Sequence, residues 1–333
     1  MKIIVPMAGM GKRMRPHTLT IPKPLIPLAG KPIVQWLVED ISRMSEARIE
    51  EIAFVIGDFG SQVEKQLVGI ARKLGAKGTL YYQDEPLGTA HAILCASESL
   101  SGNLIVAFAD TLFRANFKIN PDEEGVIWVH KVDNPSSFGV VQLSPEGYIN
   151  GFVEKPEQFI SDLAIIGIYY FRDGAYLKRE LQFLIEHDIK DKGEYQLTSA
   201  LEHMKNKGVK FKPGKVEEWL DCGNKDATVF THQRVLELHK HENLLADNLV
   251  SEDSVIKPPC YIGRNVHIQN SVIGPYVSIG DHSRVRNSVI SNSIIQNHTV
   301  VEDKIITNSM IGSHVHCKGK MEDVSIGDYT TVK

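Results

Sequence analysis

The sequence predicts an α/β domain with a mainly parallel β-sheet, followed by a solenoid of short β-strands. Over the first two-thirds of the chain, short β-branched runs alternate with helical patterns, and after about Asp247 apolar residues recur every five or six positions. A chain of 333 residues also exceeds one typical hydrophobic core, so two domains are expected. We place these domains at residues 1–246 and 247–333.

The first region has the element order that builds a parallel sheet. Helical patterns cover residues 31–44, 61–74 and 89–100, and they separate the strand-like runs KIIVPM, IEEIAFVIG, GTLYYQD and NLIVAFAD. Such units place helices on both faces of a mainly parallel, mixed sheet, so the domain is predicted to be Rossmann-like. Ligands bind beyond the carboxyl ends of such strands, where AGMGKR, QDEPLG and Asp110 fall.

Between residues 125 and 171 the pattern becomes strand-rich. The runs GVIWVHKV, FGVVQLSPEGYINGFVEKP and LAIIGIYYF predict an insertion or lid built on the same sheet. Helical patterns follow at 175–186 and 196–205, then the strand-like VEEWLDCG and a helix at 226–243 that leads out of the domain.

The final region repeats with a nearly constant period. Every third apolar position gives spacings of 17, 16, 16 and 15 residues, which fits a three-sided coil that buries one apolar residue per face in each turn. The segments NSVIG, NSVIS, NSIIQ and NSMIG repeat at one corner, and the region resembles the hexapeptide-repeat left-handed β-helix. The predicted inward positions are Ile262, Ile268, Ile273, Ile279, Val285, Ile290, Ile295, Val301, Ile306, Ile311, Cys317, Ile326 and Val332.

Composition excludes several classes of protein. A net charge of −4 without a basic block gives no reason to expect nucleic acid or an anionic membrane as a partner. No stretch approaches the roughly 20 apolar residues of a membrane span, so we expect neither export nor membrane insertion. The four cysteines form no CxxC pair, which argues against zinc and disulfides and favours a reducing cytoplasm. These cysteines are Cys95, Cys222, Cys260 and Cys317.

The segment PMAGMGKRMRP follows the first strand and has the composition of a phosphate-binding loop. A Walker loop would need glycine at Pro6 and serine or threonine at Arg13, and a dinucleotide fingerprint would need a small residue at Met14. Neither pattern fits. What remains is a glycine loop in which backbone N–H groups approach an anion beside cationic side chains, or a plain strand-to-helix turn with surface cations. The residues of this loop are Gly9, Gly11, Lys12, Arg13 and Arg15.

The next segment, IPKPLIPLAGKP, presents two lysines between prolines. Because proline fixes φ and disfavours helix, we expect a stiff loop that holds Lys23 and Lys31 in place.

Together these segments resemble the loop and PKxLxP patterns of the sugar-1-phosphate nucleotidylyltransferases. The resemblance spans almost all of residues 1–230 and continues in order through QDEPLGTAHAI, FAD, FGVV, FVEKP, IIGIYYF, EYQLTSAL and WLDCGN. It implies an enzyme that joins a nucleoside triphosphate to a sugar 1-phosphate and releases pyrophosphate.

The resemblance also implies roles for the charged residues. Asp110 and Asp221 would hold Mg²⁺, Arg13 would clamp the triphosphate, and Lys23 would neutralise charge near the α-phosphate. The alternative for Asp110 is a helix cap. A catalytically silent scaffold subunit is the non-enzymatic alternative, although it would have little reason to keep all four residues.

For the sugar phosphate, the resemblance implies binding by Gly139, Glu154, Lys155, Gly167 and Tyr169. Lys155 would meet the phosphate and Glu154 would accept hydrogen bonds from sugar hydroxyls. An exposed turn is the alternative for this pair. We expect glucose 1-phosphate, with N-acetylglucosamine 1-phosphate and mannose 1-phosphate as alternatives.

For the nucleotide, the resemblance implies that Gln83 hydrogen-bonds the base and that Gly88 lets the base or ribose lie against backbone. Two positions depart from the family pattern. Lys12 replaces the usual threonine, and Ala8 stands where many thymidylyltransferases have glycine and uridylyl-transferring relatives often have alanine. Both dTTP and UTP therefore stay open. Trp219 is expected in the core.

Three histidines of the repeat, His282, His298 and His314, are 16 residues apart, and Asn265 holds the same place one coil earlier. Because Asn and His tolerate left-handed backbone, we interpret this position as a tight corner rather than an acyltransferase base. We expect a structural or assembly role for the solenoid, in a homo-oligomer assembled through it.

Overall fold

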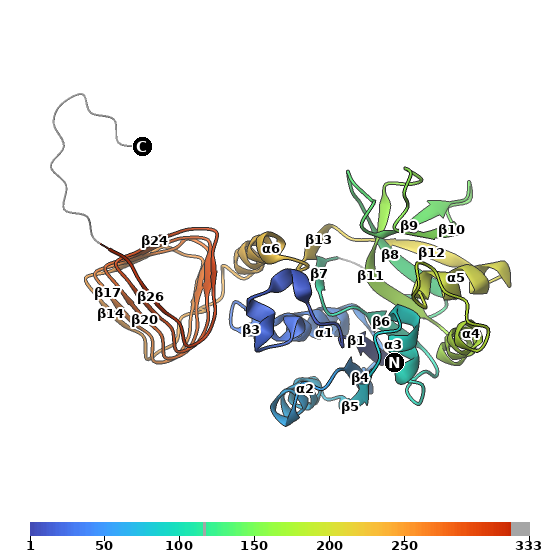
Figure 1. Ribbon diagram of the computed structural model, residues 1–333, viewed down its shortest axis with the longest axis horizontal. Helices are drawn as coiled ribbons and strands as arrows, with labels where there is room; N and C mark the ends of the chain where they lie inside the picture. Colours follow the sequence, from blue (N-terminus) through green and yellow to red (C-terminus); the bar gives the residue numbers. More distant parts are fainter. Residues whose placement is uncertain (116–117, 321–333) are drawn as a thin grey trace. The chain divides into compact units, whose positions relative to one another are not determined.

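The computed structural model describes residues 1–115 and 118–320. The chain divides into two compact units, which are Met1–Ile26 with Lys31–Asn224 and Pro27–Gly30 with Lys225–Lys333 (Figure 1). Since the second unit contains helix α6 (Lys225–Leu238), its limit differs from the domain boundary between 246 and 247, which stays a prediction. None of the described helices has the length and apolarity needed to cross a bilayer.

The first unit is built on one mixed sheet with the path β10-β9-β11-β6-β1-β4-β5, to which β8 and β12 are joined beside β11. Strands β6, β1, β4 and β5 are parallel, whereas β11 runs antiparallel to β6. The strand-rich segment therefore extends the predicted sheet. The bounds are β1 (Lys2–Pro6), β4 (Glu51–Ile56), β5 (Lys77–Tyr82), β6 (Leu104–Ala107), β8 (Gly125–Lys131), β9 (Gly139–Leu143), β10 (Ile149–Glu154), β11 (Leu163–Phe171) and β12 (Phe211–Lys215).

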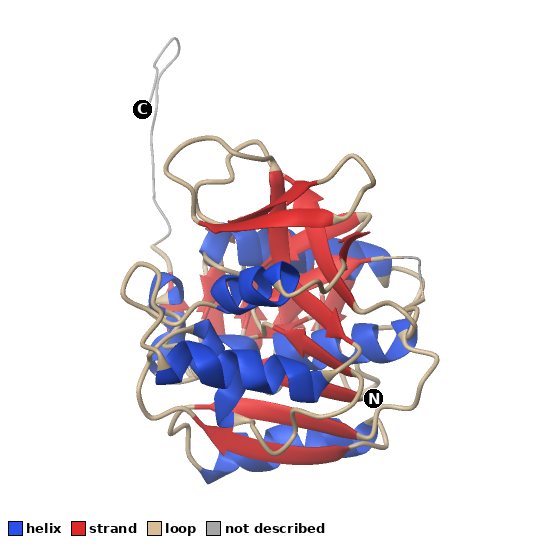
Figure 2. Ribbon diagram, turned by 90° about the vertical axis from the view of Figure 1, so that its right-hand side faces the viewer, coloured by secondary structure: helices blue, strands red, loops and turns tan. Residues whose placement is uncertain are grey.

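Helices cover both faces of this sheet (Figure 2). On one face, apolar residues of α3, α4 and α5 pack with Ile4, Ala53 and Val106 in one buried cluster. Strand residues such as Ile3 and Val5 alternate to the other face and are also buried. The helices are α1 (Ile33–Met44), α2 (Ser61–Lys73), α3 (Thr89–Cys95), α4 (Gly174–Glu186) and α5 (Leu197–Asn206), with 3₁₀ turns η1 (Lys12–Met14), η2 (His17–Leu19) and η3 (Lys23–Leu25).

Short strands complete the first unit. The antiparallel pair β7 (Thr111–Arg114) and β13 (Glu218–Asp221) follows the end of β6, and it places Asp221 opposite Thr111. In the proline-rich segment, β3 (Lys31–Pro32) belongs to the first unit and β2 (Pro27–Leu28) to the second. The sequence pattern did not predict β7 or β12, because a four- or five-residue strand leaves little periodicity to detect.

The second unit contains a parallel β-helix with three sheets, as predicted; its left-handed coiling stays a prediction. The predicted inward residues from Ile262 to Val301 are buried in one apolar cluster, and Ile306, Ile311 and Cys317 pack against it. The first of these sheets contains β14 (Val250–Glu252), β17 (His267–Gln269), β20 (Arg284–Arg286), β23 (Val300–Glu302) and β26 (His316–Lys318). The second contains β15 (Val255–Ile256), β18 (Val272–Ile273), β21 (Val289–Ile290) and β24 (Ile305–Ile306). The third contains β16 (Cys260–Ile262), β19 (Val277–Ile279), β22 (Ser293–Ile295) and β25 (Met310–Ile311).

The β-helix begins before the repeat pattern does. Strand β14 pairs with β17 so that Ser251 stands where the next coil has Ile268, and the first coil therefore lacks the apolar residue that marks this position. The predicted positions Ile326 and Val332 lie outside the described residues.

The repeated histidines occupy left-handed corners, as their residue type predicted. His282, His298 and His314 have φ of 60°, 55° and 58°, and Asn265 has 54°. Their rings stack with centroids 4.9 Å apart.

Candidate active site

Loops at the carboxyl ends of β1, β5 and β6 surround a cavity of about 290 Å³, here called the first cavity. Predicted residues from all three loops meet there, as expected for a parallel sheet. It is lined by Pro6, Met7, Ala8, Gly9, Gly11, Lys23, Pro24, Gln83, Pro86, Gly88, Thr89, Ala92, Phe108, Ala109, Asp110 and Glu194.

A second cavity, of about 240 Å³, is lined by residues of β9, β10, β11 and β13 and of neighbouring loops. It shares Thr89, Phe108 and Asp110 with the first cavity, so the two meet at the end of β6. Its lining includes Arg13, Phe138, Gly139, Glu154, Gly167, Tyr169, Gln196, Thr198, Trp219 and Asp221.

A cluster of two carboxylates and two cations lies where the cavities meet. Lys23 Nζ donates to Asp110 Oδ2 at 2.6 Å, and the Lys23 side chain is only 12% exposed. Burial, and next the negative charge of Asp110, raise the pKa of Asp221, whereas a hydrogen bond from Gly223 N–H, Lys23 and Arg13 oppose this rise. The ionised Asp221 is therefore destabilised in a way that an added cation would offset.

The two carboxylates could hold a divalent cation. No group of three or more His, Cys, Asp and Glu side chains with metal-binding geometry occurs in residues 1–115 and 118–320. Magnesium usually keeps several waters and binds proteins through one or two carboxylates together with substrate phosphates. The pair Asp110 and Asp221 fits that requirement.

Arg13 lies beside Asp221 rather than in the first cavity. A Cβ placed on Gly223 would be 3.0 Å from Asp221 Oδ2 and 3.1 Å from Arg13 Nη2, so both side chains crowd the same glycine. Among the described lining residues, Arg13 appears only in the second cavity and Lys12 in neither. Their contacts with a triphosphate stay predictions.

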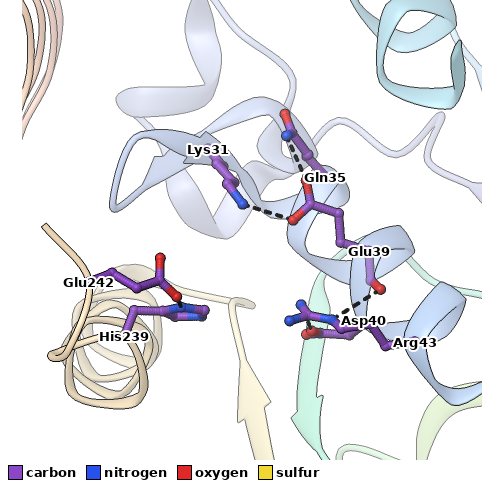
Figure 3. Close-up of polar contacts among 7 residues, drawn as sticks. All are labelled: Lys31, Gln35, Glu39, Asp40, Arg43, His239 and Glu242. Carbon is purple, nitrogen blue, oxygen red and sulfur yellow. Dashed lines mark hydrogen bonds and ion pairs between the residues drawn. The ribbon is translucent and has the colours of Figure 1, made fainter. Parts of the chain in front are cut away.

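The two lysines of the proline-rich segment have different surroundings. Lys23 reaches the cluster, whereas Lys31 Nζ donates to Glu39 Oε2 at 2.8 Å (Figure 3). The Lys31 ammonium also lies over the ring of Trp36. Gln35 also donates to Glu39, at 2.7 Å, so α1 holds this carboxylate toward Lys31. Lys31 lines neither cavity as far as the chain is described.

Gln83 and Gly88 lie together in the first cavity. The amide nitrogen Nε2 of Gln83 is 3.2 Å from the Gly88 carbonyl oxygen and 3.1 Å from Nδ1 of His91. Gly88 has φ of +116°, and a Cβ there would lie 2.5 Å from the carbonyl oxygen of Tyr195. Only glycine fits this position, because the backbone of Tyr195 passes so close.

Glu154 is held at the edge of the second cavity by several neighbours. Thr198 Oγ1 donates to its Oε2 at 3.4 Å, and Lys155 Nζ lies 3.4 Å from its Oε1. A Cβ on Gly139 would be 3.0 Å from the same Oε2, so the glycine gives this carboxylate its space. Lys192 Nζ donates to the backbone carbonyls of Glu154 and Lys155 and fixes the turn.

Aromatic residues form another wall of the second cavity. Tyr169 is buried and packs edge-on against Phe108 with ring centroids 6.1 Å apart; burial, followed by Glu154, raises its pKa. Phe108 also lies 3.3 Å from a Cβ placed on Gly167. Trp219, expected in the core, is half-buried on the cavity wall and packs against Phe138 with centroids 4.9 Å apart.

The sequence assigned no role to three polar residues that connect the cavities. Thr89 Oγ1 donates to Gln196 Oε1 at 3.1 Å and accepts from Leu197 N–H, and Gln196 Nε2 donates to Glu194 Oε2. Thr89 lines both cavities, Glu194 the first and Gln196 the second. The motifs GTAHAI and EYQLTSAL contain them, but their side-chain pairing is visible only in the fold.

Comparisons with known proteins show which sequences and folds this chain resembles. The nucleotidyl transferase family model matches residues 2–237. The low-salt glycan biosynthesis nucleotidyltransferase Agl11 of Haloferax volcanii is 29% identical over 265 residues, which cover 77% of this chain and 71% of that protein. The glucose-1-phosphate thymidylyltransferase of Streptomyces antibioticus is 33% identical over 247 residues, or 71% of this chain and 67% of that protein.

Another relative is named for a different nucleotide and a different sugar phosphate. The mannose-1-phosphate guanylyltransferase catalytic subunit beta of Drosophila pseudoobscura pseudoobscura is 33% identical over 190 residues, which cover 54% of this chain and 50% of that protein. The solved structure of a UDP-glucose pyrophosphorylase complexed with UDP-glucose matches with a TM-score of 0.58 and 24% identity, over 71% of this chain and 98% of that chain. At this identity the match shows the shared fold.

Proposed function

The chain belongs to the nucleotidyl transferase family and is a sugar-1-phosphate nucleotidyltransferase, and from this premise we propose that it joins dTTP or UTP to glucose 1-phosphate. The observation that supports this proposal best is the meeting of two cavities at Asp110, beside Lys23 and Asp221. We assign the first cavity to the nucleoside triphosphate and the second to the sugar phosphate. Two polyanions then face each other across a cluster that can neutralise them.

In the proposed reaction, an oxygen of the sugar phosphate attacks the α-phosphorus in line. The new P–O bond forms while the bond to the β-phosphate oxygen breaks, and pyrophosphate leaves with those electrons. The attacking phosphate is already ionised near neutral pH, so the step requires no general base. The protein therefore contributes positioning and positive charge, from Lys23 and Arg13.

Asp110 and Asp221 would hold Mg²⁺, which, when bound, would neutralise charge developing on the phosphates. Lys23 already forms an ion pair with one of these carboxylates, Asp110, and both residues line the first cavity. Glu154 and Lys155 would orient the sugar phosphate in the second cavity, where Thr198 holds the Glu154 carboxylate.

The substrate pair has alternatives within the same reaction. Two relatives of equal sequence identity to this chain are named for different substrates. One is a glucose-1-phosphate thymidylyltransferase and the other is a mannose-1-phosphate guanylyltransferase. A methyl or hydroxyl difference between substrates changes binding by only about 1–3 kcal/mol, and a few pocket side chains can decide it. N-acetylglucosamine 1-phosphate and mannose 1-phosphate are therefore the alternative acceptors.

The decisive experiment pairs each nucleoside triphosphate with several sugar 1-phosphates and measures pyrophosphate release. We expect the highest kcat/KM with dTTP or UTP and glucose 1-phosphate, at least a hundredfold loss in Asp110→Asn and Asp221→Asn, and no activity after chelation of divalent cations. The matched control is Asp226→Asn, whose carboxylate is 85% exposed and lines neither cavity. Normal release by both active-site variants would refute the metal assignment.

For the second unit we propose self-association through one face of the β-helix. One face is covered by α6 through Tyr276 and Glu237, and another has ion pairs such as Arg286–Glu302. The third presents Val255, Val289 and Ile305, which are 53%, 45% and 86% exposed and line a groove of about 500 Å³.

A second copy, packed antiparallel on the same face, fits the charges at the ends of this groove. Asp253 borders the groove in its first coil, and Lys304 borders it just before β24, the last described strand of this face; Asp303 also lines the groove there and accepts a hydrogen bond from Asn287 Nδ2 at 2.9 Å. In the antiparallel arrangement, Asp253 of each copy therefore faces Lys304 of the other, and the aliphatic side chains meet between them. We assign the oligomer contact to this face.

A further inference from the structure

We propose that His91 is a positioning residue that fixes the side-chain amide of Gln83, and that the fixed amide selects bases with a ring N–H. This inference rests on the proposed binding of the nucleotide in the first cavity. It predicts that the site takes uracil or thymine in preference to cytosine, and guanine in preference to adenine.

The orientation of the Gln83 amide follows from its partners. The Gly88 carbonyl oxygen can only accept a hydrogen bond, so the atom of Gln83 that lies 3.2 Å from it must be the NH₂ nitrogen. The same nitrogen lies 3.1 Å from Nδ1 of His91. If Nδ1 accepts the second N–H and Nε2 of His91 carries the ring proton, both amide donors are used within the protein. The oxygen Oε1 is then the polar atom of Gln83 that remains for a ligand.

Both partners of the amide are held firmly. Gly88 cannot shift toward Tyr195, because its Cα already lies so close to the Tyr195 backbone that a Cβ would be 2.5 Å from the carbonyl oxygen. His91 belongs to α3, which follows directly after Gly88. The backbone of Gln83 is also fixed, by a hydrogen bond from its N–H to the Ile56 carbonyl at 2.9 Å. Gly88, His91 and the backbone of Gln83 therefore hold the Gln83 amide in one orientation.

A fixed acceptor distinguishes bases by the hydrogen at their ring nitrogen. Uracil and thymine carry a hydrogen on N3 and guanine carries one on N1, so each can donate to Oε1. Cytosine N3 and adenine N1 have a lone pair there, which would face the lone pairs of Oε1 without a hydrogen between them. An amide free to turn would accept either kind of base, because it could present its NH₂ group instead.

The test compares two substitutions of His91. Asn carries Oδ1 at the distance from the backbone where His has Nδ1, so His91→Asn can restore the acceptor. His91→Leu fills similar space with a methyl group and cannot. We measure kcat/KM for UTP, dTTP, CTP, GTP and ATP by pyrophosphate release in the wild type and both variants, and KM for the sugar phosphate as a second readout.

We expect His91→Leu to lower the UTP:CTP ratio of kcat/KM by about tenfold through the nucleotide KM, with the KM of the sugar phosphate unchanged. His91→Asn should keep the wild-type ratio. The inference is wrong if the wild type prefers CTP to UTP, if His91→Leu keeps the ratio, or if His91→Asn loses it as His91→Leu does. Should His91→Leu fail to fold, His91→Ala is assayed with the same expected loss.

Equilibrium binding separates this inference from the proposed reaction. Calorimetric titration with UTP and CTP, without sugar phosphate, reports selection of the base whether or not catalysis occurs. If no pair of substrates releases pyrophosphate, the proposed function fails, and the UTP:CTP ratio of dissociation constants in the wild type and the two variants still decides the role of His91.

Discussion

Acidification should weaken the second unit through one buried histidine, His232. The side chain is fully buried in α6, and its Nε2 lies 2.6 Å from Oγ of Ser278 in the β-helix. Its Nδ1 has no hydrogen-bond partner in the described part of the chain. Burial without a compensating charge lowers the pKa of His232 from 6.5 to about 3. Between these values, the unfolded state binds a proton and the folded state does not.

The size of the effect follows from linkage between protonation and folding. Because the folded pKa lies below the unfolded value, stability falls as pH decreases below about 6.5 and continues to fall toward about 3. Each pH unit in this interval costs about 1.4 kcal/mol, so a change from pH 7 to pH 5 should remove about 2 kcal/mol from the free energy of unfolding. At pH 5 this number depends only on the unfolded pKa, because the folded site remains neutral.

Hydrogen exchange of β-helix amides at the two pH values, corrected for intrinsic exchange rates, measures this free energy within the intact protein. His232→Gln keeps a nitrogen at the position of Nε2 and does not titrate, so its β-helix should lose about 2 kcal/mol less than the wild type does. His241→Gln, at an exposed histidine, is the matched control and should behave as the wild type. Equal acid losses in the wild type and His232→Gln would refute the reasoning.

Two further predictions concern the second cavity and the β-helix face. Gly139→Ala should raise the KM of the sugar phosphate about tenfold and leave the nucleotide KM unchanged, because the new Cβ would press on the Glu154 carboxylate. The control is Gly69→Ala, because a Cβ at Gly69 meets open space. Steady-state kinetics with each substrate varied would contradict this if both KM values stay unchanged. Ile305→Asp should reduce the mass measured by light scattering to that of one chain. The control Val250→Asp, on another face of the β-helix, should leave the mass of the oligomer unchanged. Equal masses for both variants would exclude the Ile305 face as the oligomer contact.

Much of the fold follows from patterns that are local in the sequence. The alternation of strands and helices, the period of the β-helix and the left-handed corners each depend on residues within one element or one coil. Corner residues such as His298 could be recognised because residue type and backbone angle are linked directly. The domain predicted from residue 247 includes the first coil, but the inward positions of that coil were not predicted, because Ser251 stands where the next coil has Ile268.

The sequence by itself determined the family, the reaction class and the strand ends where Gly9, Gln83 and Asp110 meet, because motif order and hydrophobic period are properties of the chain. Only the tertiary structure decided that Lys23 reaches Asp110 while Lys31 pairs with Glu39, and that His91 fixes Gln83. Side-chain direction depends on which segments pack together, and the segments that hold Lys23 and Asp110 lie 87 residues apart in sequence.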